Sequence, residues 1–165
     1  MDINMIKKLN LIYEPLYKYT MKLVNELKEL NYDAQWGFYG FHSIRHKDEF
    51  ITEFFPIPVI TVRDICDIGV DLNHIFIEGK LTREAAMKFD YSLLQDYTFE
   101  VYGINDYLND FYNSKLDVEG IGRRIEESKE KEIGIQIFLQ SNCAFSKIIE
   151  AVGKCQKWNT YIMDR

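Results

Sequence analysis

The chain has 165 residues, and its acidic residues outnumber its basic ones to give a formal net charge of −6 at pH 7. Phosphate backbones repel such a chain, so we expect no nucleic-acid partner. No apolar run approaches the roughly 18 residues that span a bilayer, and the N-terminus lacks a secretory signal pattern, so we expect a cytoplasmic protein without a membrane partner. The three cysteines are widely spaced, which is typical of reduced, mostly buried thiols.

The first 30 residues carry the spacing of an amphipathic helix. The stripe recurs at alternating steps of four and three residues and consists of Leu9, Tyr13, Leu16, Thr20, Leu23, Leu27 and Leu30. Pro15 leaves two alternatives open, because proline inside a helix removes a hydrogen bond. Either a short helix ends near Tyr13 and a longer one starts at Pro15, or one helix is kinked there.

Either a second helix or a sheet could cover this apolar stripe. Its spacing admits a coiled coil, but a seam that includes Tyr13 and Thr20 is more typical of a helix lying on a sheet. Because consecutive elements are usually neighbours in space, we predict that Leu23 and Leu27 contact the sheet that follows. The solvent side of the helix would carry Lys22, Glu26 and Lys28.

Residues 36–78 alternate, break and alternate again, which predicts three or four successive antiparallel strands. The first strand, from Trp36 to His42, places aromatic side chains on both of its faces. Pro56 and Pro58 cannot donate to a ladder, so residues 54–58 are expected at an edge, a bulge or a crossing between strands. The segment from Asp67 to Leu72 alternates strictly and predicts a half-buried strand.

Helical and strand patterns alternate in the second half of the chain. We expect helices over residues 83–89, 106–112, 117–131 and 142–156, and strands over residues 97–102 and 133–139. This order predicts a single α+β domain over residues 1–165, with an N-terminal helix and an antiparallel meander that continues into a mixed sheet. The helices are expected mainly on one face of that sheet, and Ile135, Ile137 and Leu139 in its core.

Acidic and histidine side chains around the 67–72 strand are the strongest candidates for catalysis. They are Asp64, Asp67, Asp71, His74 and, further away, His42. Outward carboxylates on a strand can hold Mg²⁺ or raise one another's pKa, which would suit a small metal-assisted hydrolase. The solvent face of a half-buried strand has the same composition, and we favour that simpler interpretation. His42 and His46 need not converge on extended chain, so we predict no metal and no cofactor.

Two other groups of residues are candidates for binding. Aromatic residues crowd the start of the meander, where Trp36, Phe38, Tyr39 and Phe41 exceed what one face easily buries, so some could line a groove or a subunit contact. Arg123 and Arg124 follow a Gly-Ile-Gly segment near a helix start, a weak pattern for an anion site. Because no catalytic motif is present, we favour a non-enzymatic binding or interaction module whose partner is a second copy or another protein.

Overall fold

The computed structural model describes most of the chain. It leaves out residues 1–2, 40–41, 47–48, 54–56, 71–73, 104–109, 113–117, 128–129 and 161–165, and it describes only the backbone of residues 3–10, 12, 38–39, 42–46, 49–53, 57, 110–112 and 159–160. In chain order, the elements are α1 (Ile3–Glu29), β1 (Ala34–Tyr39), β2 (His42–His46), β3 (Glu49–Glu53), β4 (Ile57–Val62), β5 (Cys66–Val70), β6 (His74–Thr82), α2 (Arg83–Lys88), the short 3-10 helix η1 (Tyr91–Leu94), β7 (Thr98–Gly103), β8 (Asp110–Tyr112), α3 (Val118–Glu127), β9 (Glu132–Gln140) and α4 (Phe145–Thr160).

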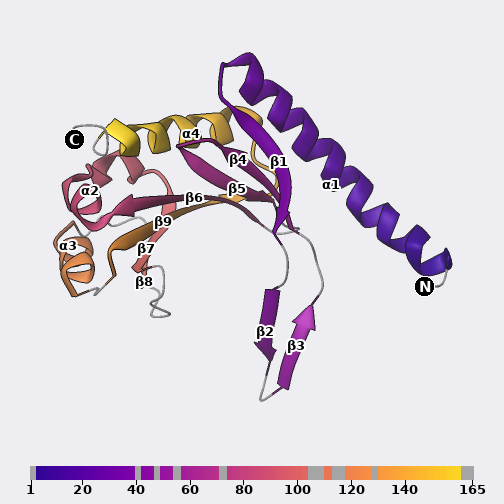
Figure 1. The fold of residues 1–165 in the computed structure, drawn as a ribbon, viewed down its shortest axis with the longest axis horizontal. Helices are drawn as coiled ribbons and strands as arrows, with labels where there is room; N and C mark the ends of the chain where they lie inside the picture. The colour runs from indigo at the N-terminus through magenta and orange to yellow at the C-terminus, as the bar shows by residue number, and fades with distance from the viewer. Residues whose placement is uncertain are drawn as a thin grey trace.

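A seven-stranded sheet in the order β1-β4-β5-β6-β9-β7-β8 organises these elements, and β2 and β3 form a separate hairpin (Figure 1). The α+β fold and the N-terminal helix before the meander are therefore confirmed. The expectation of a mixed sheet is wrong, because every described strand pairing is antiparallel. The helix between β6 and β7 suggested a parallel pair. Those two strands do run parallel, but β9 lies between them and is antiparallel to both.

All four α-helices cover the same face of the sheet, as predicted. Five directly opposed residues form an apolar row across that face, from Ile60 through Ile68, Ile77 and Ile137 to Phe99, and all five are buried. One continuous core joins this row to side chains from α1, α2, α3 and α4. The three core positions predicted on β9, Ile135, Ile137 and Leu139, are among the buried residues. We call this side of the sheet the helix face.

α4 packs against the middle of the helix face. Its Trp158 ring lies so close to Gly79 on β6 that a Cβ built at Gly79 would stand 1.6 Å from the Cζ3 atom of the indole. The same ring meets Phe89 edge-on, with centroids 5.9 Å apart. A glycine on β6 is therefore what allows the largest side chain of α4 to enter the core.

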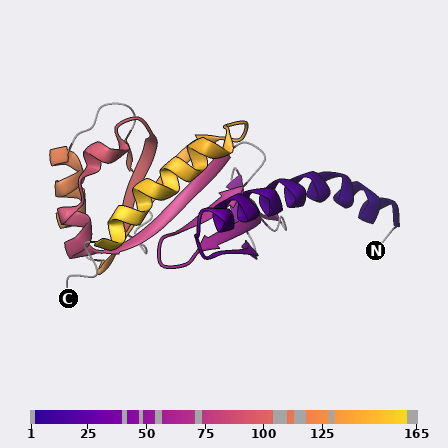
Figure 2. The same cartoon turned by 90° about the horizontal axis from the view of Figure 1, so that it is seen from above.

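α1 is one continuous helix through Pro15, which settles the choice between one helix and two. Its C-terminal half contacts β1 and β4, and Leu23 and Leu27 are buried there, as predicted. Lys22 and Lys28 are exposed and Glu26 is half-buried. The N-terminal half extends past the edge of the sheet, which Figure 2 shows from above.

The stripe was expected to stay covered as far as Leu30, which is instead 52% exposed. The reason is a C-terminal cap that ends the helix at this point. Asn31 adopts φ 66°, and its amide donates to the Lys28 carbonyl at 2.9 Å. The Tyr32 amide donates to the Leu27 carbonyl at 3.0 Å, so the chain turns toward β1 and Leu30 is left outside.

Candidate functional site

The face of the sheet opposite the helices, which we call the open face, carries the most unusual side chains of the described structure. Because the strands pair in register, its residues form rows across the sheet. A polar row runs through Gln35, Thr61, Asp67, Glu78, Gln136 and Glu100. A neighbouring apolar row runs through Val59, Gly69, Phe76 and Phe138. No described α-helix contributes to this face, since all four belong to the core on the other side.

Carboxylates dominate the polar row. Asp67 on β5 stands directly opposite Glu78 on β6, and directly opposed like charges destabilise a strand pair. The Tyr102 hydroxyl from β7 donates a hydrogen bond to Oε1 of Glu78. Glu100, further along the row, is only 2% exposed. A cationic group placed over Asp67 and Glu78 would relieve their repulsion, so the row favours a positively charged partner.

Aromatic rings lie flat along the open face beside the polar row. A Cβ built at Gly69 would stand 1.9 Å from the Cζ atom of Phe76, so that ring covers the glycine opposite it. Tyr102 covers Gly134 in the same way, with its Cζ atom 2.4 Å from a Cβ built there. Such pairing lets a ring shield the neighbouring backbone of a sheet. The two rings thereby fill the space that a side chain at Gly69 or Gly134 would take.

The structure separates the predicted Asp/His residues. Asp64 is exposed in the turn between β4 and β5 with φ 60°, and Asp67 lies in the polar row. His74 is the first residue of β6 and precedes Glu78 by four residues. Because Glu78 is paired with Asp67, about 13 Å of strand separates His74 from Asp67. Asp71 lies outside the described residues, and only the backbone of His42 is described. Among described side chains, no group of three or more His, Cys, Asp and Glu could hold a metal ion.

The predicted aromatic residues have different places. Trp36 lies on the helix face and meets Tyr17 of α1 edge-on, with centroids 5.2 Å apart, so it belongs to the contact between α1 and the sheet. Phe38 follows it on β1 with the same parity, and Tyr39 has the opposite parity. The structure does not describe the side chains of these two residues, and Phe41 lies outside the described residues.

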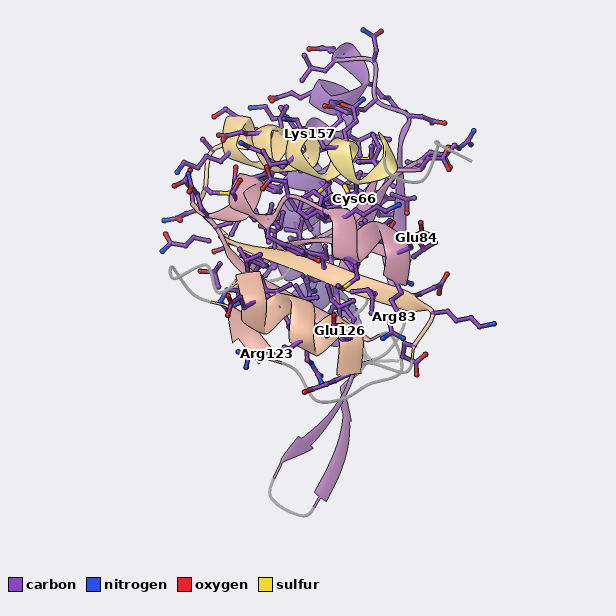
Figure 3. All side chains as sticks on the ribbon, turned by 90° about the vertical axis from the view of Figure 1, so that its left-hand side faces the viewer. Cys66, Arg83, Glu84, Arg123, Glu126 and Lys157 are labelled. Carbon is purple, nitrogen blue, oxygen red and sulfur yellow. The ribbon has the colours of Figure 1, made fainter. Side chains whose placement is uncertain are left out.

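The predicted anion site at Arg123 and Arg124 falls inside α3. Gly122 lies within the helix, so its amide is directed along the helix and not toward a ligand. Arg123 is exposed and Arg124 is partly buried. The other end of α3 is capped from α2, where Nη2 of Arg83 donates to the Glu126 carbonyl at 2.5 Å (Figure 3). A guanidinium at this end is favourable, because the last carbonyls of a helix carry partial negative charge.

The cysteines do not offer a nucleophile. Cys66 and Cys155 are buried, as predicted, and Figure 3 shows Cys66 beneath α4. Burial raises the pKa of the Cys155 thiol well above its ordinary value, and its hydrogen bond with Cys66 raises it further. Burial also raises the pKa of Cys143. The reactive form of cysteine is the thiolate, so Cys143 and Cys155 are kept in the unreactive state.

The sequence reasoning missed four residues of the polar row and its surroundings: Glu78, Glu100, Tyr102 and Gln136. The only local signal was Glu100, an acid between apolar neighbours in a predicted strand. The other three look like ordinary solvent-facing positions until β9 is placed between β6 and β7.

Comparisons with known proteins support the fold and indicate no activity. No family model matches the sequence, and no curated protein matches it. Among solved structures, the chain is similar to the conserved hypothetical protein Pfu-178653-001 from Pyrococcus furiosus, with a TM-score of 0.67 and 17% sequence identity over 93% of this chain and 98% of that one. At this identity the likeness shows a shared fold alone. In the described part of the chain, none of the helices has the length and apolar character needed to cross a bilayer.

Proposed function

We propose that this protein is a non-enzymatic, cytoplasmic binding module that holds a protein partner on the open face of its sheet. One observation carries the proposal: a wide sheet has all four described α-helices on one side, and its other side combines the carboxylates of Asp67 and Glu78 with the aromatic rings of Phe76, Phe138 and Tyr102. Interfaces combine aromatic residues at their centre with polar groups around them. The partner is a second copy of the chain or another protein, and no nucleic acid is expected on an acidic surface.

The metal-assisted hydrolase receives no support from the described side chains. A catalytic metal needs several protein ligands that converge on one point. Asp64 and Asp67 lie toward one end of the strands and His74 lies at the other. We therefore propose no reaction for the open face.

Full-length variants can test the binding function. Phe138→Lys places a positive charge in the apolar row, and Met87→Lys makes the same kind of change on exposed α2, where Met87 is 43% accessible. We expect the wild-type protein to self-associate or to bind members of a library of lysine-rich and neutral 15-residue peptides. Phe138→Lys should weaken that binding at least tenfold, and Met87→Lys should leave it unchanged. Circular dichroism would establish that both variants fold.

Two results would contradict the proposal. One is a wild-type protein that stays monomeric at millimolar concentration and binds none of the peptides. The other is equal binding by Phe138→Lys and wild type, since a positively charged partner on the open face would be repelled by a new positive charge in its apolar row.

A further inference from the structure

The N-terminal half of α1 has no described strand beneath it. α1 has 27 residues, which makes it about 40 Å long, and its contacts with β1 and β4 come from the C-terminal half. We call residues 3–15 the arm. Within it, Leu11 is 76% exposed, and Figure 2 shows the arm beyond the edge of the sheet. A helical segment this short is marginal in water by itself, so a packed partner would stabilise it.

The arm and the open face are complementary in charge. The arm carries Lys7 and Lys8 against Glu14, so it is net positive in a chain whose net charge is −6. Glu14 is already paired within the helix, since Nζ of Lys18 lies 2.6 Å from its Oε1 atom. The charged side chains that the open face exposes at least in part are mostly acidic by contrast: Asp67, Glu78 and Glu132 share its described strands with a single lysine, Lys80.

The arm and the open face are also complementary in apolar surface. Seven of the arm's residues are apolar: Ile3, Met5, Ile6, Leu9, Leu11, Ile12 and Tyr13. The open face offers the half-buried rings of Phe76 and Phe138, and the four described α-helices all pack on the other side. A sheet face without a helix and a helix without a sheet bury their apolar surface best against each other.

Building on the proposed function, we propose that the partner on the open face is the arm of a second copy of this chain. Each protomer would place its arm on the other's open face, which closes a two-fold dimer. The arm cannot reach the open face of its own chain, because α1 is one continuous helix whose C-terminal half lies on the helix face. Pairing of two arms is disfavoured, because two net-positive segments would meet. In a pair of arms, the positions that flank the stripe would form the salt bridges between the two helices. These positions, such as Asn10 and Ile12, carry no opposite charges.

Charge reversal in the full-length protein tests this arrangement. The arm variant is Lys7→Glu with Lys8→Glu, and the face variant is Asp67→Lys with Glu132→Lys. A control variant, Glu119→Lys with Glu127→Lys, makes the same charge change on exposed positions of α3. Sedimentation equilibrium at low ionic strength would give each mass as a function of concentration.

We expect wild type and the control variant to be dimers, and the arm and face variants each to dissociate at least tenfold more readily. An equimolar mixture of the arm and face variants should form a dimer again, because both contacts in the mixed pair join opposite charges. Wild type that is monomeric at every concentration overturns the inference, and so does a mixture that stays monomeric.

Other outcomes separate this inference from the proposed function. If only the face variant dissociates, the occupant of the open face is not the arm, and the inference fails while the binding function stands. If only the arm variant dissociates, the arms pair with each other and the inference fails as well. Failure of the proposed function would instead appear as equal binding by Phe138→Lys and wild type.

Discussion

At the scale of single residues, two contacts in the helix-face core decide how closely α4 can approach the sheet. Gly79 on β6 provides the space for the ring of Trp158. Cys155, which precedes Trp158 by one turn of α4, lies against Cys66 of β5. Neither contact is visible in the sequence, since the partners are separated by 79 and 89 positions respectively. Both make α4 sensitive to small changes in volume.

Gly79→Ala should be strongly destabilising. The added methyl group would overlap the indole of Trp158 and force α4 away from β6, at a cost of about 1–3 kcal/mol in the free energy of unfolding. Gly122→Ala is the matched control, because nothing lies within 4 Å of a Cβ at that helical position. It should be neutral or stabilising by up to about 1 kcal/mol. Urea denaturation measures both, and equal losses would show that Trp158 does not pack on Gly79.

A tyrosine beside η1 should make stability depend on alkaline pH. Burial raises the pKa of Tyr97 from 10.0 to about 12, and the neighbouring Glu150 carboxylate adds to this rise. Since the folded-state pKa lies above the unfolded one, the contribution to stability is fully present below pH 10 and is lost as pH rises toward 12. The free energy of unfolding should therefore fall across this range. Tyr97→Phe should make the fall less steep, and an unchanged slope would count against the burial of this hydroxyl.

At the scale of elements, α1 combines two behaviours that its sequence presented as alternatives. The C-terminal half is a helix lying on a sheet, with Leu23, Val24 and Leu27 buried. The N-terminal half keeps the heptad-like spacing but has no described strand beneath it. One uninterrupted stripe is therefore buried against the sheet in the C-terminal half and has no described strand beneath it in the N-terminal half.

Removal of residues 1–31 should produce an aggregating protein. The deletion uncovers the apolar positions of β1 and β4 that pack against α1, among them Ala34, Ile60 and Val62. Light scattering on the purified truncate would show the aggregation. A substitution at the exposed end of the helix, Leu11→Ser, should leave the full-length protein folded and free of aggregates. A folded, monomeric truncate would mean that the whole of α1 is an appended arm.

At the scale of the whole molecule, the core is continuous from α1 at one end of the sheet to α3 at the other. A continuous core predicts that the chain unfolds as one cooperative unit, which is the expected behaviour of a single domain of this size. The hairpin of β2 and β3 contributes no strand to the seven-stranded sheet. It should therefore add little to the cooperative transition.

The two tryptophans of the chain allow a direct test. Trp36 lies against Tyr17 near one end of the sheet, and Trp158 lies against Phe89 in the middle of the helix face. In Trp158→Phe and Trp36→Phe variants, the fluorescence of the remaining tryptophan should report the same urea midpoint as far-UV circular dichroism. An earlier fluorescence transition at Trp36 alone would show that α1 and β1 unfold separately, and the single-domain prediction would fail.

The sequence by itself determined the elements whose signal is local. Periodicity placed Leu23 and Leu27 beneath α1 and the aliphatic side chains of β9 in the core, because side-chain direction follows from spacing along one helix or strand. The same reasoning identified the α+β class and the face that the helices cover. It failed at Leu30, where the αL turn at Asn31 ends the helix, and at residues 110–112, which were expected in a helix and form the strand β8.

Only the tertiary structure decided the order of the strands and the content of the open face. The polar row joins Asp67, Glu78, Glu100 and Gln136 from four strands, and it exists because β9 enters between β6 and β7. Strand pairing depends on contacts between residues far apart in the chain, and no spacing within one segment encodes them. On its own strand each of these residues is an ordinary outward-facing polar side chain. Register places them side by side, and only then do they form one polar row.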